Sequence, residues 1–120
     1  MARILIVDDS RTSRKFLKEM LEGANHEIVA EAVNGVEGIE KYKTFTPDIV
    51  TMDITMPILD GIGAVKEIIN INPDAKVIMV TAAGQKNNMV EALKCGAADF
   101  IQKPFDSEVI LATIEKVLEE

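Results

Sequence analysis

The stretch Ile4-Leu5-Ile6-Val7, followed at once by Asp8-Asp9, decides the fold of this 120-residue chain. A short continuous apolar run that ends in charged residues is typical of a strand buried on both faces of a parallel sheet. Ser10 can then cap a helix. The apolar face of that helix is expected to hold Phe16, Leu17, Met20 and Leu21. The chain therefore opens with a strand, an acidic loop and a helix.

The same unit recurs along the chain. Four further strands are expected at residues Glu27–Ala32, Asp48–Asp53, Lys76–Thr81 and Asp99–Gln102. Helices alternate with these strands, and the residues that start or stop them are Asp60, Asp106, Pro47, Pro73 and Gly96. Five strands alternating with five helices predict an α/β fold with a parallel central sheet and right-handed crossovers. Ligands of such sheets bind outside the carboxyl ends of the strands.

Composition excludes several classes of protein. The chain is long enough for one domain, has 48% hydrophobic and 28% charged residues, and contains no apolar run long enough for a signal sequence or membrane span. We therefore expect a cytoplasmic protein with no membrane partner. A net charge of −7 argues against nucleic acid as a partner. The single cysteine, Cys95, excludes an internal disulfide, and the single histidine, His26, is expected in an exposed loop.

Polar side chains follow four of the five expected strands. Asp8-Asp9 follow the first strand, Asp53 and Thr81 end the third and fourth, and Lys103 follows the fifth. Because the carboxyl ends of parallel strands meet at one edge, these side chains should converge there. Three neighbouring carboxylates repel one another unless a cation neutralises them, and carboxylate, carbonyl and water oxygens are the ligands that Mg²⁺ prefers. The pattern predicts a magnesium site.

The same edge lacks the groups of several common chemistries. No histidine, serine or cysteine is placed there as a nucleophile paired with a base, which excludes a hydrolytic triad. The run Gly61-Ile62-Gly63 has no third glycine and no strand directly before it, so it is not a phosphate-binding cradle. An aspartate beside a magnesium site, with a cation and a hydroxyl nearby, suits phosphoryl transfer to a carboxylate.

Four segments in this order resemble those of CheY-type response-regulator receivers. They are Ile6-Val7-Asp8-Asp9-Ser10, Met52-Asp53-Ile54-Thr55-Met56-Pro57 with Asp60-Gly61, Thr81-Ala82, and Lys103-Pro104-Phe105. The resemblance runs from Arg3 to Leu118. It implies a doubly wound, flavodoxin-like (βα)5 fold with strand order 2-1-3-4-5. It also implies one receiver domain over residues 1–120, with no effector domain.

The resemblance assigns roles at the acidic end of the sheet. Asp53 is implied to be the phosphoacceptor, which takes its phosphoryl group from a phosphohistidine of a CheA-like sensor histidine kinase. Mg²⁺, for which Mn²⁺ can substitute, is implied to bind Asp9 and Asp53 directly, Thr55 through its main-chain carbonyl, and Asp8 through metal-bound water.

Other residues are implied to hold and read the phosphoryl group. Lys103 pairs with a phosphoryl oxygen, and Thr81 and Ala82 contribute further phosphoryl contacts. Thr81 and Phe100 form the switch, with Phe100 at the position of the family's rotating aromatic residue. Pro104, after Lys103, resembles the proline of the family's cis peptide bond.

The expected function is a phosphorylation-controlled binding module rather than an enzyme acting on separate substrates. Phosphorylation would change the surface of the fourth helix, fifth strand and fifth helix of a monomer. The run Thr51–Pro57 resembles chemotaxis receivers that act on the flagellar motor switch protein; another phosphate-dependent partner or a phosphatase is also allowed.

Two alternatives remain open. One is a phosphorelay intermediate that passes its phosphate to a histidine phosphotransferase. An aspartate-nucleophile phosphatase is disfavoured because Asp8-Asp9 are adjacent and 120 residues leave little room for a substrate pocket. Thr55 and Ala83 flank the site without an acidic or amide group, so we expect slow loss of the phosphoryl group.

Overall fold

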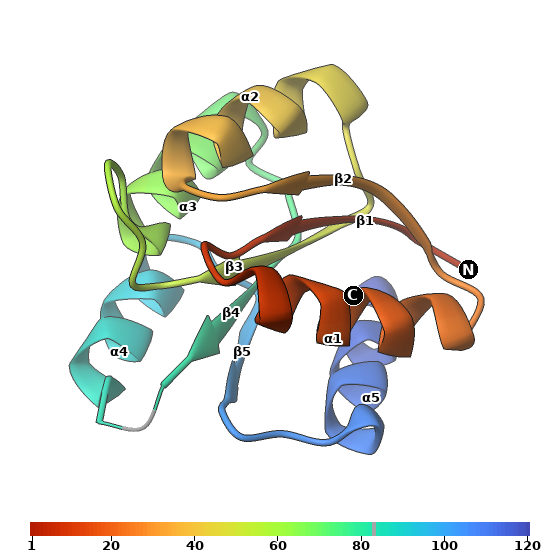
Figure 1. The fold of residues 1–120 in the computed structure, drawn as a ribbon. Coiled ribbons are helices and arrows are strands. Elements are labelled where there is room, and N and C mark those ends of the chain that lie inside the picture. The colour runs from red at the N-terminus through yellow and green to blue at the C-terminus, as the bar shows by residue number, and fades with distance from the viewer. Residues whose placement is uncertain (83) are drawn as a thin grey trace.

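The strands and helices alternate strictly in the computed structural model, which describes residues 1–82 and 84–120 (Figure 1). The strands are β1 Arg3–Val7, β2 Glu27–Ala32, β3 Ile49–Asp53, β4 Val77–Thr81 and β5 Asp99–Gln102. The helices are α1 Arg11–Gly23, α2 Gly35–Phe45, α3 Gly61–Ile71, α4 Lys86–Lys94 and α5 Ser107–Leu118. Neighbouring strands pair in parallel in the order β2-β1-β3-β4-β5. This confirms the predicted fold class and strand order.

The sheet separates two hydrophobic cores. Helices α1 and α5 cover one face and α2, α3 and α4 cover the other (Figure 1). The first core includes Leu17 and Leu21 of α1 with Ile110 and Ile114 of α5, all almost fully buried. Central strands need apolar residues on both faces, and all five residues of β4 are buried accordingly. The continuous apolar runs in the sequence thus reflect burial from two sides.

Helix starts follow the predicted capping residues. The side chains of Ser10, Asp60 and Asp106 each accept a hydrogen bond from a backbone amide in the first turn of α1, α3 and α5. Gly96, just beyond α4, has a φ of +111°, a conformation that glycine adopts without strain. Capping chemistry was therefore a reliable signal.

Three strand starts differ from prediction by one residue, and the first of them is β1, which begins at Arg3 rather than Ile4. Asp48 and Lys76 precede β3 and β4 rather than lying within them. The Asp48 carboxylate accepts a hydrogen bond from the Arg3 amide at 2.8 Å. The Lys76 ammonium donates to the carbonyl oxygens of Val117, Leu118 and Glu120, at the end of α5. Both side chains form long-range polar contacts that the apolar pattern could not reveal.

Two side chains do not lie where the sequence placed them. Phe16 leaves 47% of its surface exposed instead of joining the core of α1, and its ring meets Phe105 edge-on at 6.4 Å between centroids. His26 is half-buried rather than an exposed loop residue, and its Nδ1 accepts a hydrogen bond from the Ala2 amide at 3.0 Å. Neither the contact of Phe16 with Phe105 nor that of His26 with Ala2 can be predicted from the pattern of a single sequence.

β5 is a short edge strand of four residues. Phe100 is 38% exposed, and its amide donates to the carboxylate of Asp99 at 2.8 Å. The other oxygen of Asp99 lies 3.4 Å from the ammonium of Lys116 in α5. Among the described residues, none of the helices combines the length and apolar character needed to cross a bilayer.

Candidate functional site

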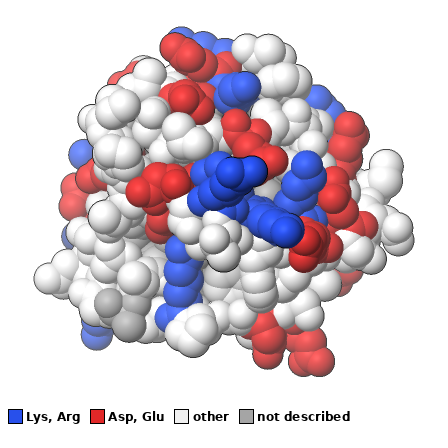
Figure 2. Space-filling view, viewed as in Figure 1, with Lys and Arg blue, Asp and Glu red and all other residues white. Residues whose placement is uncertain are grey.

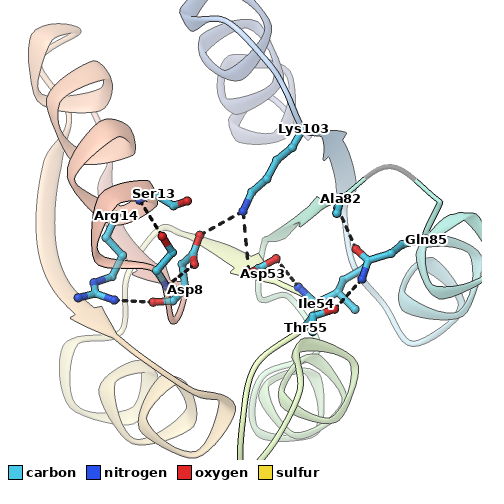
Figure 3. A network of polar contacts seen from close by, with 10 residues as sticks. Asp8, Ser13, Arg14, Asp53, Ile54, Thr55, Ala82, Gln85 and Lys103 are labelled. Carbon is cyan, nitrogen blue, oxygen red and sulfur yellow. Dashed lines mark hydrogen bonds and ion pairs between the residues drawn. The ribbon is translucent and has the colours of Figure 1, made fainter.

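The predicted site residues converge at the carboxyl edge of the sheet. Strand pairing places Val7 beside Met52, Asp53 beside Val80 and Thr81 beside Gln102, so the four strand ends are level. One carboxylate oxygen from each of Asp8, Asp9 and Asp53 lies within 4.8 Å of the others. Figure 3 shows Lys103 reaching from the end of β5 toward Asp8 and Asp53. The parallel topology brings these groups together, as expected from the sequence.

Asp8 is a buried carboxylate, with 1% of its residue surface exposed. Its Oδ1 accepts a hydrogen bond from the Ser10 amide at 2.8 Å, and its Oδ2 lies 3.5 Å from the Lys103 ammonium. Among the described residues, Asp8 Oδ2 has no hydrogen-bond donor. Buried polar atoms are nearly always satisfied, so this oxygen is suited to a cation or a cation-bound water.

The loop that contains Asp8 is held in place by Arg14. Arg14 of α1 donates from Nη1 to the Asp8 carbonyl oxygen at 2.7 Å, and its Nε pairs with Glu31 of β2 at 3.2 Å. A planar guanidinium can hold two acceptors in fixed geometry. Figure 3 shows the contact of Arg14 with Asp8. Together with the Glu31 pair, this contact ties α1 and β2 to the acidic loop.

Asp53 lies at the end of β3 with its carboxylate largely enclosed. Its Oδ1 accepts a hydrogen bond from the Ile54 amide at 2.9 Å, and its Oδ2 lies 3.9 Å from the Lys103 ammonium. Burial, aided by repulsion from Asp8 and more weakly from Asp9, raises the pKa of Asp53 to about 6 against the opposing effects of Lys103 and the Ile54 amide.

The donor chemistry of the acidic cluster fits a divalent cation. Three carboxylates face one ammonium, and the oxygen ligands match those of hard cations. Burial and the neighbouring carboxylates raise the pKa of Asp53, and Asp8 Oδ2 accepts no hydrogen bond from the described residues, so both carboxylates would gain from a bound cation. The residues present therefore fit the predicted ion.

Thr81 and Phe100 lie on one face of the sheet. Phe100 pairs with Met79, two residues before Thr81, and side chains two residues apart share a face. Thr81 is fully buried, and its hydroxyl contacts the sulfur of Met89 in α4 at 3.3 Å. Thr81 therefore contacts α4 in this structure.

The Lys103–Pro104 bond is cis, as the resemblance implied.

Sequence reasoning missed Gln85 at the site, as it did Arg14. Its Oε1 accepts a hydrogen bond from the Ala82 amide at 2.8 Å, and its Nε2 donates to the Thr55 hydroxyl at 2.6 Å (Figure 3). An amide group therefore does lie beside Thr55, contrary to the premise of the expected slow phosphoryl loss. Ala83, the other residue in that expectation, lies outside the described residues. No motif marked Gln85, because its role depends on the meeting of two loops.

An open, mostly apolar hollow of about 420 Å³ adjoins Lys103 between α1 and the β5–α5 connection. Its walls are formed by Thr12, Ser13, Phe16, Leu17, Ala82, Lys103, Pro104 and Phe105. The exposed ring of Phe16 thus borders the site instead of the core.

A comparison with models of protein families matches residues 4–115 to the response regulator receiver domain. The match covers nearly the whole chain, which therefore belongs to the family of response regulator receiver domains. Two-component signalling is the process in which this family acts, and the resemblance drawn from the four sequence segments is confirmed.

The most similar relatives include chemotaxis proteins. CheY of Thermotoga maritima is 50% identical over 115 residues, or 96% of each chain. CheY of Bacillus subtilis is 50% identical over 116 residues, or 97% of each chain. Among solved structures, a chain of the CheX–CheY–BeF3–Mg²⁺ complex from Borrelia burgdorferi is 38% identical with a TM-score of 0.92, covering 96% of this chain and 87% of that chain.

Proposed function

We propose that this chain accepts a phosphoryl group on Asp53 from a phosphohistidine of a CheA-like sensor histidine kinase and then binds a partner through α4, β5 and α5. The observation that supports it most directly is the enclosed Asp53 carboxylate, with Lys103 at 3.9 Å and two further carboxylates beside it. In the transfer, an oxygen of Asp53 bonds to phosphorus while the bond from phosphorus to the imidazole nitrogen breaks. The imidazole leaves with the electron pair of that bond and takes up a proton.

Each residue of the site has a part in this step. Mg²⁺, or Mn²⁺ in its place, would be held by Asp9, Asp53 and the Thr55 carbonyl, with Asp8 on a bound water, and would supply neutralisation of the phosphoryl oxygens. Lys103 pairs with one phosphoryl oxygen as a charge-assisted donor. The Ala82 amide and the Thr81 hydroxyl donate to others. The carboxylate is thereby positioned rather than chemically altered before attack.

The phosphodonor is expected to approach over α1. The apolar hollow beside Lys103 is lined by Phe16 and Phe105, which gives a donor protein an apolar contact next to the reacting atoms. In Figure 2, Lys and Arg side chains gather at the centre of the view, over α1. A shallow hollow in that region is lined by Glu31 and by four basic residues, Arg11, Arg14, Lys15 and Lys18. This basic surface on a chain of net charge −7 favours an acidic partner.

Output is proposed to depend on Thr81 and Phe100. When Thr81 turns from Met89 toward a phosphoryl oxygen, space opens on the α4 side of the sheet, where Phe100 also lies. Apolar residues of α4, β5 and α5 already contact solvent: Val90, Leu93, Phe100 and Val109. A change in the Phe100 ring would therefore alter a surface suited to binding a protein.

We propose chemotaxis as the pathway, with the flagellar motor switch protein as the partner and the monomer as the acting form. The names of the CheY relatives support this choice, and the CheX–CheY complex supports a second protein partner, such as a phosphatase. The chain would act as one receiver domain over residues 1–120, a signalling module that assists only its own phosphorylation and dephosphorylation.

The proposed chemistry is tested by labelling with acetyl phosphate, with and without Mg²⁺, and by mass spectrometry of the product. We expect one phosphoryl group per chain, lost in Asp53→Ala and kept in Asp74→Asn, which changes an exposed carboxylate outside the site. Unchanged labelling of Asp53→Ala would refute the assignment. Steady release of phosphate from many small esters would instead indicate a phosphatase.

The partner is tested by affinity capture with and without beryllofluoride. Recovery of the flagellar motor switch protein only with beryllofluoride and Mg²⁺ would support chemotaxis. Transfer of the phosphoryl group from the chain to a histidine phosphotransferase would support the phosphorelay alternative.

A further inference from the structure

We propose that Gln85 is a positioning residue that occupies the phosphoryl-binding amide of Ala82 until a phosphoryl group displaces it; this inference rests on the proposed function. Gln85 precedes α4, yet its side chain makes no capping bond to that helix. It instead joins the Ala82 amide to the hydroxyl of Thr55, in the β3–α3 loop. The residue thus links two loops that border Asp53.

The two hydrogen bonds fix the orientation of the Gln85 amide group. A backbone N–H is only a donor, so the carbonyl end of Gln85 must face Ala82. Its NH₂ end then faces the Thr55 hydroxyl, which accepts at 2.6 Å. Because both ends have partners, Gln85 cannot release Ala82 without also losing or bending its bond to Thr55.

Competition follows from the donor capacity of Ala82. One N–H forms one good hydrogen bond, and in this structure it is directed to Gln85 Oε1 at 2.8 Å. A phosphoryl oxygen that uses the same N–H must take the place of that amide oxygen. Gln85 therefore stabilises the unphosphorylated state and weakens the binding of the phosphoryl group.

The displacement also links the site to α4. Gln85 is the last residue before Lys86, the first residue of α4, whereas Thr55 and Ala82 belong to the loops after β3 and β4. Release of the Gln85 side chain frees the start of α4 from the β3–α3 loop. This is a second connection from Asp53 to α4, separate from the contact between Thr81 and Met89.

The test compares variants by the concentration of beryllofluoride that half-saturates the protein at saturating Mg²⁺. Binding is monitored by ¹⁹F NMR. Loss of one neutral hydrogen bond from the unbound state predicts that Gln85→Ala lowers this concentration about threefold to tenfold. Gln85→Glu keeps the acceptor and adds charge, so it should raise the concentration. The midpoint of a titration with Mg²⁺ alone should not change in Gln85→Ala.

The hydrogen bond between Gln85 and the Thr55 hydroxyl provides a second, independent variant. Thr55→Val removes this hydrogen bond, so it should also tighten beryllofluoride binding, and the double variant should gain less than the sum. Asn87→Ala is the matched control, since it removes an exposed amide from the first turn of α4. The ¹⁵N shift of Ala82 should differ between wild type and Gln85→Ala without beryllofluoride and agree once it is bound.

Different outcomes would overturn the role of Gln85 and the proposed function of the chain. Unchanged or weaker beryllofluoride binding in both Gln85→Ala and Thr55→Val, with normal binding by the wild type, would overturn the role of Gln85 alone. A wild type that binds no beryllofluoride in Mg²⁺ would overturn the proposed function, and with it this inference.

Discussion

The α-carbon of Gly61 packs against the backbone carbonyl of Asp53, and a Cβ at residue 61 would overlap that carbonyl oxygen. The Gly61 amide also donates to the Ile54 carbonyl oxygen at 2.8 Å. The start of α3 is thus packed under the proposed phosphorylation site. This gives a physical reason for a glycine directly after the capping residue Asp60.

Gly61→Ala should therefore displace the end of β3 and lower stability by about 1–3 kcal/mol, as expected for overpacking against backbone atoms. Phosphorylation by acetyl phosphate should slow as well, because Asp53 moves with its carbonyl. Urea unfolding and the initial labelling rate measure the two effects. Gly23→Ala is the control: a Cβ there meets no atom within 4 Å, and stability should stay equal or rise. Equal stability of Gly61→Ala and wild type would contradict the packing argument.

Asp8→Asn should stabilise the metal-free protein while removing its response to Mg²⁺. The substitution keeps the acceptor for the Ser10 amide and relieves repulsion within the acidic cluster, for a gain of about 1–2 kcal/mol. The wild type should gain about 1.4 kcal/mol at Mg²⁺ tenfold above its dissociation constant. Urea unfolding with and without Mg²⁺ measures both changes, with Asp74→Asn as the control. A loss of metal-free stability in Asp8→Asn would show that the Lys103 pair outweighs the repulsion.

Stability should fall when His26 becomes protonated. Burial and the nearby N-terminal amine lower the pKa of His26 from its usual 6.5, against a weaker opposing effect of Glu115. The unfolded chain therefore binds the proton first, so the stabilisation is complete above pH 6.5 and is lost as pH falls through the lower folded pKa. The protonated ring cannot accept the Ala2 amide hydrogen bond.

The measurement must separate His26 from Asp53, whose raised pKa acts in the opposite direction. Asp53 contributes stability at low pH that is lost as pH rises through about 6. We therefore expect urea unfolding of Asp53→Asn to show a loss of stability toward acid pH that becomes smaller when His26→Gln is added. Parallel pH curves for the single and double variants would rule out this role of His26.

Ile58→Asn should stabilise the protein even though it removes an apolar side chain. Ile58 has a φ of +71°, which is strained for a β-branched residue, and the residue is 82% exposed, so it contributes little burial. Asparagine tolerates this conformation, and the expected gain is about 1 kcal/mol by thermal or urea unfolding. Ile71→Asn, at an exposed isoleucine at the end of α3, should give no such gain. If both variants lose stability equally, the backbone strain is not relieved by asparagine.

The sequence predicted those parts of the protein that depend on local pattern and strand order. Apolar runs located all five strands, and parallel pairing then brought Asp8, Asp53 and Lys103 to one edge. The contacts of Gln85 and His26 were missed because each joins segments distant in sequence through one side chain. Periodicity reports which face of an element is buried, but not which polar groups meet across loops.

The Phe100 amide bonds to the carboxylate of Asp99, and this has a consequence for how a partner can bind β5. A free sheet edge normally allows another chain to add as an extra strand through backbone hydrogen bonds. Here the edge strand has only four residues, and one of its amides is already satisfied within the strand. Strand addition is therefore disfavoured. A protein that binds at this edge, as proposed, is expected instead to contact the exposed Phe100 ring and the flanking helices, as an amphipathic helix lying across β5 would do.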